Sequence, residues 1–342
     1  MCLNDGNMRP DVRRMSSKLK NIIKYLLSLS VAAVLMYFCF RKVNWGEFVA
    51  SLSGCRWWWV GASILVGVLS NWFRGERWRE ILLPVDERTG RLTTFNAVNI
   101  GYLANFVLPR IGEFVRCGVV SKDSGDGKAS YDRVLGTVVT ERSFDMIVML
   151  LILIVFLAFK AEEFGAFFLD RMWAPLSRSI NFSLWWIVAA AVLALAAMAF
   201  LIIHYRNRNA LAGKLCGFCR GIWDGVISCF RMRNGWKFLI YTVLIWAMYF
   251  LMSYTSLRAV PLLDGLTAVD ALFLMLAGSL GWVVPVPGGF GAFHYIVALA
   301  LSTVYDLPFE LGIIFATISH ESQSVMMAVT GLASYVSETL RK

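Results

Sequence analysis

Residues Asn99 to Arg116 read NIGYLANFVLPRIGEFVR, and the interpretation of the whole chain depends on this stretch. It begins as an apolar segment and ends, just after Pro109, in a group of charged residues that includes Arg110 and Glu113. A membrane-spanning helix is not expected to contain this charged group, and an ordinary loop is not expected to contain the hydrophobic run that precedes the group. The stretch therefore indicates a half-buried charged turn.

The composition is typical of an integral membrane protein. Of the 342 residues, 58% are hydrophobic and only 16% are charged, and the mean hydropathy is +0.62. Thirteen Trp and eleven Tyr suit a protein with two membrane interfaces, where these side chains are enriched. The net charge of +10 does not indicate nucleic acid, because Lys and Arg collect in the cytoplasmic loops of multi-span proteins. We expect membrane lipids as partners and no nucleic acid.

The cysteines do not indicate a disulfide framework, because there are seven of them and most lie in or beside apolar segments. Cys216 and Cys219 form a lone Cys-x-x-Cys pair with no second pair or nearby His. We therefore expect no metal and no cofactor. No cleavable signal peptide is evident, because the first residues are polar and Ile22–Phe40 is long enough to remain in the bilayer as an anchor.

Several stretches are long and apolar enough to be candidate membrane spans. They are Ile22–Phe40, Trp57–Phe73, Val134–Phe159, Leu184–Ile203, Phe238–Leu257, Ala268–Val284 and Leu311–Val336. Two further segments, Leu92–Leu108 and Ala292–Val304, are too short or too interrupted to count by themselves. The sequence therefore predicts an all-α integral membrane protein.

The distribution of Lys and Arg indicates how Leu92–Leu108 lies. If the N-terminus is cytoplasmic, Leu92–Leu108 is re-entrant and Ala292–Val304 crosses, the inside segments hold 25 Lys and Arg and the outside loops hold 7. If Leu92–Leu108 crossed instead, this bias would collapse, so the positive-inside rule favours the re-entrant alternative. The predicted fold has about eight transmembrane helices, a re-entrant segment and a broken helix, and internal repeats are left open. We expect a plasma (inner) membrane protein with both termini cytoplasmic.

The chain is expected to have a basic cytoplasmic segment at 1–21, a polytopic membrane domain at 22–338 and a short cytoplasmic C-terminus at 339–342. An amphipathic helix is expected at about 209–233. Its apolar face holds Leu211, Leu215, Phe218, Ile222, Val226 and Phe230, and its opposite face holds Arg220, Asp224 and Arg231. Such a helix suits the cytoplasmic leaflet, and packing on the protein's own surface is an equal alternative.

Helices cannot continue through two places in the sequence. One is the turn at Pro109 and Gly112, and the other is Pro285–Gly291, which has two prolines and three glycines. Irregular backbone at membrane depth is tolerated only where it is buried in protein or lines a wet cavity. Paired interruptions in two halves of a membrane protein point to a central binding site.

A new helix starts after each break, and its free N–H groups and positive dipole end favour an anion. Arg110 and Arg116 follow the first break and can each hold a phosphate bidentately. In the alternative interpretation, these two arginines and Glu113 pair among themselves on a cytoplasmic turn.

Val134–Phe159 carries Glu141, Arg142 and Asp145 in its first half. A charge at bilayer depth costs at least about 2.5 kcal/mol, so such residues face a cavity or one another. They predict the charged wall of a polar lipid pathway; the alternatives are a buried ion pair and a cytoplasmic end of the helix. Arg74 and Arg77 could attract an anionic headgroup, although ordinary anchoring at the inner interface is the better interpretation of Arg77.

His294 lies in the first helical turn after the second break, and His320 and Glu321 lie within Leu311–Val336. A proton-coupled step is one hypothesis for these residues, and packed, hydrogen-bonded histidines are the other. The chain contains no His-Glu-x-x-His, Walker or Gly-x-Ser-x-Gly motif. We therefore expect no catalytic residue.

Three runs together resemble the lysylphosphatidylglycerol synthase transmembrane family, the flippase-like membrane domain. They are Asn105-x-x-x-Pro109-Arg110-x-Gly112-Glu113-x-x-Arg116, Glu141-Arg142-x-x-Asp145 and Pro285-x-Pro287-Gly288-Gly289-x-Gly291. Arg74-x-x-Arg77-Trp78 looks like the upstream arginine motif of the family. The resemblance covers nearly all of the chain from the first span onward, and it implies a multi-span protein that moves a lipid or a lipid-linked headgroup between leaflets.

In the synthases of that name, the membrane region is joined to a cytosolic aminoacyl-transfer domain. Because this chain ends at Lys342, lysyl transfer is not expected. Many relatives carry Glu shortly after the Pro-Gly-Gly-x-Gly run, where this chain has His294. A change from carboxylate to imidazole could alter the charge of the substrate or the coupling to protons.

The leading hypothesis is a lipid translocase without its own ATPase, acting on an anionic or zwitterionic headgroup. The alternatives are a membrane-embedded transferase that acts on a lipid carrier and a non-catalytic membrane partner of a lipid-modifying enzyme; an oligomer is also left open. The candidate substrate-binding residues are Arg74, Arg77, Asn105, Pro109, Arg110, Gly112, Glu113, Arg116, Glu141, Arg142, Asp145, Pro287, Gly288, Gly289, Gly291, His294, His320 and Glu321.

Overall fold

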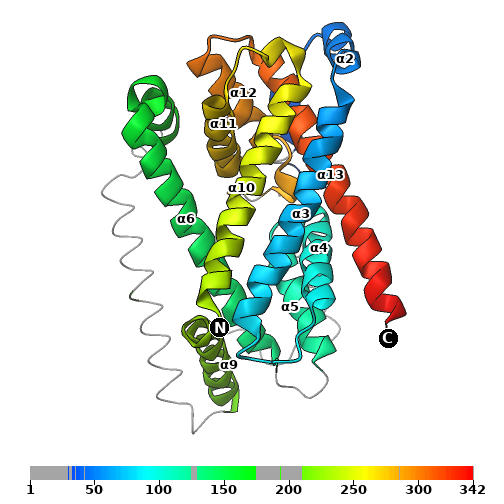
Figure 1. Ribbon diagram of the computed structural model, residues 1–342, viewed down its shortest axis with the longest axis vertical. Helices are drawn as coiled ribbons and strands as arrows, with labels where there is room; N and C mark the ends of the chain where they lie inside the picture. Colours follow the sequence, from blue (N-terminus) through cyan, green and yellow to red (C-terminus); the bar gives the residue numbers. More distant parts are fainter. Residues whose placement is uncertain are drawn as a thin grey trace, which may run out of the picture.

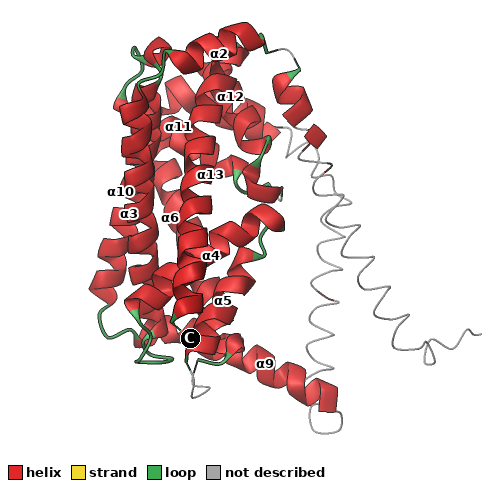
Figure 2. Cartoon of the chain, turned by 90° about the vertical axis from the view of Figure 1, so that its right-hand side faces the viewer, coloured by secondary structure: helices red, strands yellow, loops and turns green. Residues whose placement is uncertain are grey.

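The computed structural model describes residue 30 and residues 33–341, except 35, 42, 125–128, 175–192, 194–209 and 285. The described residues form helices and no strands, which confirms the all-α prediction (Figures 1 and 2). The predicted span Leu184–Ile203 lies outside the described residues apart from Leu193, and so does the first part of Ile22–Phe40.

Four long helices run most of the length of the molecule (Figure 1). They are α3 (Trp57–Leu82), α6 (Tyr131–Ala166), α10 (Gly235–Ala259) and α13 (Phe309–Leu340). At a rise of 1.5 Å per residue, even the 25 residues of α10 extend about 38 Å, which exceeds the hydrocarbon core of about 30 Å. Each of the four contains one of the predicted spans.

Two shorter helices, α4 (Arg91–Val107) and α5 (Gly112–Asp123), form a hairpin that we call the first hairpin. The Thr93 hydroxyl donates to Asp123 at 2.8 Å, so the start of α4 lies beside the end of α5. The 17 residues of α4 extend about 26 Å. The chain therefore enters and leaves at the same end of the molecule, which is the geometry that a re-entrant Leu92–Leu108 requires (Figure 2).

Helices α11 (Ala268–Gly281) and α12 (Ala292–Val304) form the second hairpin. The Tyr305 hydroxyl donates to Asp270 at 2.7 Å, which places their outer ends together. With 14 and 13 residues, each helix extends only about 20 Å. The predicted separate crossings of Ala268–Val284 and Ala292–Val304 are therefore replaced by a hairpin. The sides of the other segments do not change, because the chain still returns to the end from which it came.

By length and composition, three described stretches can cross a membrane: Tyr131–Arg171, Gly235–Ala259 and Pro287–Val304. The third is not one continuous helix, because Gly288 and Gly291 have φ angles of 58° and 80°. The continuous part is α12, which is too short to cross alone. Two of the eight predicted crossings, Ala268–Val284 and Ala292–Val304, thus form the second hairpin instead, and the number of the remaining crossings stays a prediction.

The order of the helices repeats. A long helix, a hairpin and a long helix occur first as α3 to α6 and again as α10 to α13, with α9 between them. The first helices of the two halves, α3 and α10, pack in opposite directions, since the Arg56 N–H donates to Ala259 O at 3.0 Å. The halves therefore form an inverted repeat, and their hairpins enter from opposite ends (Figure 1).

The expected helix at about 209–233 is present as α9 (Ala210–Ile227) and a 3-10 turn, η3 (Ser228–Arg231). Its buried face consists of Gly221, Gly225 and Ser228, and a Cβ on Gly136 of α6 would collide with the α9 backbone. Packing on the protein's own surface is therefore confirmed, although through small residues. Three large apolar side chains stay exposed, as a helix on the leaflet would need: Phe218, Trp223 and Phe230. The side chains of Leu211 and Leu215 lie outside the described part.

Candidate functional site

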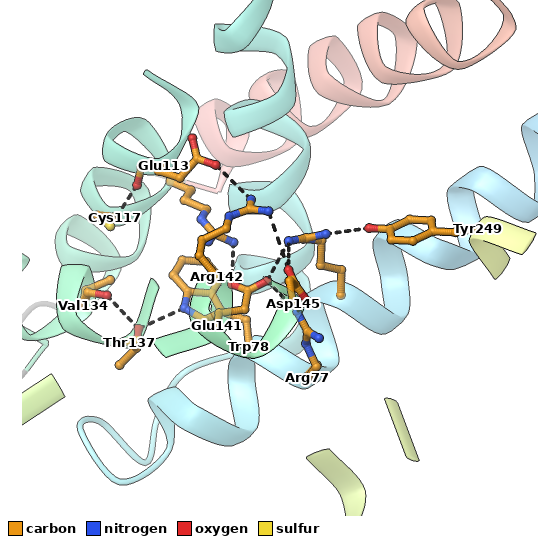
Figure 3. Close-up of polar contacts among 12 residues, drawn as sticks. Arg77, Trp78, Glu113, Cys117, Val134, Thr137, Glu141, Arg142, Asp145 and Tyr249 are labelled. Carbon is orange, nitrogen blue, oxygen red and sulfur yellow. Dashed lines mark hydrogen bonds and ion pairs between the residues drawn. The ribbon is translucent and has the colours of Figure 1, made fainter. Parts of the chain in front are cut away.

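Charged residues from three helices gather at the inner side of the first hairpin (Figure 3). We call them the charge cluster: Arg74 and Arg77 of α3, Glu113 and Arg116 of α5, and Glu141, Arg142 and Asp145 of α6. On each helix the residues are mostly three or four apart, a spacing that places them on one face. The sequence marked all seven residues as candidates, and the fold brings them together.

Glu141 is the centre of the charge cluster, and its side chain has 0% exposure. One carboxylate oxygen lies 3.2 Å from Nη2 of Arg74 and 3.1 Å from Nη2 of Arg77. The other oxygen lies 2.8 Å from Nη1 of Arg116. Three guanidinium groups therefore surround one buried carboxylate, and this contact joins α3, α5 and α6.

Asp145 is one helical turn further along α6 and lies 2.7 Å from both Arg74 and Arg77. Arg77 is completely buried in this arrangement. The interpretation of Arg77 as an ordinary interface anchor is therefore wrong. The predicted alternative in which the charged residues of α6 form a buried ion pair is confirmed. The arginine partners of Glu141 and Asp145 lie on other helices.

Arg142 and Glu113 form the accessible edge of the charge cluster. Their side chains are 40% and 25% exposed, and they pair at 3.0 Å between α6 and the first hairpin. Because Glu113 pairs with Arg142 and Arg116 pairs with Glu141, the alternative in which Arg110, Glu113 and Arg116 pair among themselves is wrong.

Arg110 does not join the charge cluster. It has a φ of 61°, and its guanidinium donates to the carbonyl oxygen of Val283 just before the second break. The rings of Phe106 and Phe290 lie 6.3 Å apart across the same region. The tips of the two hairpins therefore contact each other.

Two aromatic side chains that sequence reasoning did not assign support the charge cluster. The Tyr249 hydroxyl accepts from Arg74 at 2.6 Å, and the Arg116 guanidinium lies 4.6 Å from the ring centre of Trp78. Trp78 belongs to a quoted motif, so it could have been found. Tyr249 gives no signal, because it lies 175 residues from Arg74 in the chain.

The charge cluster is not neutral. Four guanidinium groups face three carboxylates, which leaves one positive charge in excess. Among the residues that the structure describes, one oxygen each of Glu113, Glu141 and Asp145 has no hydrogen-bond donor, and a larger set of guanidinium nitrogens has no acceptor: Nε of Arg74, Nε and Nη1 of Arg77, Nε and Nη2 of Arg116, and Nε of Arg142. Unpaired donors thus outnumber unpaired acceptors. The site can therefore accept an anion, since buried donors without acceptors are costly.

A cavity of about 10 Å³ lies against the charge cluster, between α3, the first hairpin and α6. Its lining consists of Arg74, Val98, Gly101, Tyr102, Asn105, Gly112, Glu113, Arg116 and Arg142. This volume has room for about one water. The structure therefore shows the site closed to a headgroup.

Asn105, Pro109 and Gly112 build the turn of the first hairpin. The Asn105 side-chain oxygen accepts from the Gly112 N–H at 2.7 Å and so occupies a free donor at the start of α5. A Cβ on Gly112 would collide with the Gly101 carbonyl group, so the two helices meet backbone to backbone. These contacts give the turn residues a structural role.

The remaining predicted residues gather at the tip of the second hairpin. Pro287, Gly288 and Gly289 form a tight turn, and the Gly288 carbonyl oxygen lies 2.8 Å from Nε2 of His320. His294 and Glu321 lie beside His320. The candidates therefore form two groups, one along the first hairpin and one at the tip of the second, with Arg110 at the contact between the two hairpins.

A second and larger space, a groove of about 530 Å³, lies beside α12 and the start of α13. Sequence reasoning missed it, because its walls come from distant segments and carry no common motif. They are Phe38, Cys39, Arg41, Val43, Tyr295, Phe309 and Glu310.

Long helices that exceed the bilayer thickness, two opposed half-length hairpins and buried charges between them define a polytopic membrane protein with an internal polar site. The chain belongs to the family described as lysylphosphatidylglycerol synthase TM region, whose model matches residues 23–331. This family ties the protein to lipid modification or translocation. No curated protein and no solved structure gives a significant match.

Proposed function

We propose that the protein is a lipid translocase that moves a phospholipid or a lipid-linked headgroup between the leaflets of the plasma (inner) membrane. The headgroup would pass between the two hairpins, and the charge cluster would hold its phosphate. Both chain termini would lie in the cytoplasm. The family and the inverted repeat support this proposal, since paired broken segments commonly surround a substrate site.

The observation that carries the proposal is the excess positive charge beside a closed cavity. A phosphodiester carries one negative charge and several acceptor oxygens, so it would neutralise the excess and satisfy unpaired guanidinium nitrogens. A charge held at bilayer depth usually faces a partner or a pathway. Every arginine of the charge cluster has a carboxylate partner, but four guanidinium groups share only three carboxylates, so the cluster lacks one anion.

The pair formed by Arg142 and Glu113 suggests how the headgroup would enter. It is the most exposed contact of the charge cluster, and it joins the first hairpin to α6. A phosphate that replaces Glu113 at Arg142 would open this contact and enlarge the cavity. The released Glu113 could then accept a cationic group, which makes a zwitterionic headgroup as suitable as an anionic one.

The test is transport in liposomes that hold the purified protein and fluorescently labelled phospholipids of anionic and zwitterionic type. We expect the wild type to move label between leaflets, and Arg142→Gln to lower the rate at least about tenfold, equivalent to 1.4 kcal/mol. Arg56→Gln is the matched control, because Arg56 forms an exposed ion pair with Asp264 far from the charge cluster. No transport by wild type, or equal loss in both variants, would overturn the proposal.

The alternative of an embedded transferase is less well supported. Its obvious catalytic carboxylates would be Glu113, Glu141 and Asp145. All three form ion pairs with arginines of the charge cluster, so they are poorly placed to accept a proton. Product formation by the purified protein with a donor and a lipid carrier would favour this alternative. Co-purification of a stoichiometric enzyme would favour the third interpretation, a membrane partner.

A further inference from the structure

We propose that His294, His320 and Glu321 form a binding site for a divalent transition-metal ion, and that zinc fits their donor atoms best. The site joins the second hairpin to α13 and does not depend on the proposed transport. The three donor atoms lie within 4.8 Å of one another. Two imidazole nitrogens and one carboxylate oxygen are a common set of protein ligands for Zn²⁺.

The hydrogen bonds of His320 fix which of its nitrogens is free. Nε2 lies 2.8 Å from the carbonyl oxygen of Gly288, which can only accept, so Nε2 carries the proton. In a neutral ring, Nδ1 then presents a lone pair, and it lies 3.0 Å from a carboxylate oxygen of Glu321. Two acceptors that face each other at this distance need a cation between them. The Ser324 hydroxyl lies 3.4 Å from Nδ1 and contributes only a long contact.

The contact with Gly288 is also the one that a metal-binding histidine usually makes. Such a histidine commonly donates its second ring N–H to a carbonyl or carboxylate, which orients the ring and keeps the other nitrogen available. Gly288 has a φ of 58°, a conformation that directs the turn and suits glycine. The second break therefore supplies the support for His320.

His294 gives an independent observation. Its side chain has 0% exposure, and neither ring nitrogen has a hydrogen-bond partner among the described residues. Buried polar atoms are rarely left in this condition. Its Nε2 lies 3.7 Å from the same carboxylate oxygen of Glu321 that faces His320. An ion among these three atoms would give the buried imidazole a partner.

The distances suit a metal after a small adjustment. With bonds of about 2.0–2.2 Å to Zn²⁺, two tetrahedral ligands lie about 3.3 Å apart. The two measured separations from Glu321, 3.0 and 3.7 Å, lie on either side of this value. The Glu321 side chain is 39% exposed and so is free to shift. Its exposed side also gives the ion a path of entry and leaves a fourth position open.

Aromatic rings close the other sides of the site. The ring centre of Trp282 lies 5.3 Å from that of His320 in a stacked arrangement, and Phe40 lies 6.0 Å from His294. These rings offer no competing acceptor and exclude water around the imidazoles. Sequence reasoning did not predict a metal site here, because His294 and His320 are 26 positions apart and only the fold places their ring centres 4.9 Å apart.

The test uses the full chain in detergent, purified with an affinity tag that contains no histidine, stripped with a chelator and then loaded with Zn²⁺. Elemental analysis after dialysis is expected to find about one zinc per chain in the wild type. His294→Ala and Glu321→Gln should each weaken binding at least about tenfold. His204→Ala is the matched control, because it removes the only other histidine of the chain, and it should bind as the wild type does.

A second measurement needs no variant. Co²⁺ added to the stripped wild type should give the intense visible absorption of a four- or five-coordinate site, and excess Zn²⁺ should remove it. Zn²⁺ should also raise the unfolding temperature of the wild type and not that of His294→Ala. Zinc in the wild type that does not exceed the amount in His294→Ala, together with no Co²⁺ absorption, would overturn the proposal and leave a proton to bridge Glu321 and His320.

Discussion

The two hairpins have the same geometry and opposite chemistry. Each consists of two helices that are too short to cross a bilayer, and each turns back near the middle of the molecule. The first hairpin is attached to its neighbours by ion pairs, through Glu113 and Arg116. The second is attached by apolar packing and close backbone contacts, such as that of Ala298 of α12 with Gly312 of α13. The fold therefore repeats, while the interactions that hold it do not.

This difference indicates where the molecule can change. Ion pairs can exchange one partner for another, so the attachment of the first hairpin is compatible with binding and release of an anion. Close packing of apolar groups has no such substitute, since a separated surface loses its contacts outright. We therefore expect the second hairpin to keep its contacts and the first hairpin to be able to change them.

The largest effect is expected for Glu141→Gln. The change removes the carboxylate that three buried guanidinium groups share, and breaking a buried ion pair by removing one partner costs about 3–5 kcal/mol. Thermal unfolding in detergent measures the loss. Glu163→Gln is the control on the same helix, because its exposed pair with Lys160 is worth at most about 1 kcal/mol. Similar losses in both variants would show that the charge cluster does not hold the first hairpin.

An intermediate effect is expected for Gly112→Ala. The added methyl group would meet the Gly101 carbonyl group, so the hairpin must open slightly, at a cost of about 1–3 kcal/mol. Gly118→Ala, on the same helix, has nothing within 4 Å of the new Cβ and should be neutral or stabilising. Gly281→Ala tests the second hairpin in the same way, because its Cβ would lie 2.7 Å from Cα of Phe293. If Gly112→Ala unfolds at the temperature of Gly118→Ala, the close contact in the first hairpin is not needed.

The smallest effect concerns the exposed pair of Arg56 and Asp264, which joins the start of α3 to the loop before the second hairpin. The hydrogen bond from Arg56 lowers the pKa of Asp264 below its ordinary value. A lowered folded-state pKa stabilises the fold above the unfolded-state pKa, about 3.9, and the stabilisation is lost as pH falls through the folded-state value. The unfolding temperature of the wild type should therefore approach that of Asp264→Asn below about pH 4. A constant difference between the two proteins down to pH 2 would contradict this prediction.

Much of the fold could be predicted from local patterns. The long helices follow from hydrophobic length, and the re-entrant Leu92–Leu108 follows from the Lys and Arg bias. The half-length α11 and α12 did not follow, because Val283 and Val284 extend the apolar run of α11 beyond its last helical residue. Hydropathy depends on composition alone, so it does not show that α11 ends before the apolar run does.

The candidate site could be predicted as a set of residues and not as a set of contacts. Arg77 and Glu141 are 64 positions apart, and their pairing depends on how α3 and α6 are rotated toward each other. The packed face of α9 was also hidden, because Gly221 and Gly225 contribute almost nothing to an amphipathic pattern. Close approach of backbones is a property of two helices together, so the sequence of one helix does not display it.

The contact between Gly101 and Gly112 has a mechanical consequence. With backbone against backbone, and with Asn105 closing the turn, α4 and α5 cannot separate from each other at a low cost. The first hairpin must then move as one rigid body. Any widening of the adjacent cavity has to occur where the first hairpin packs against α3 and α6, because the ion pairs there can exchange partners. A tilt about the outer ends of α4 and α5 would produce its largest displacement at the tip, next to the second hairpin.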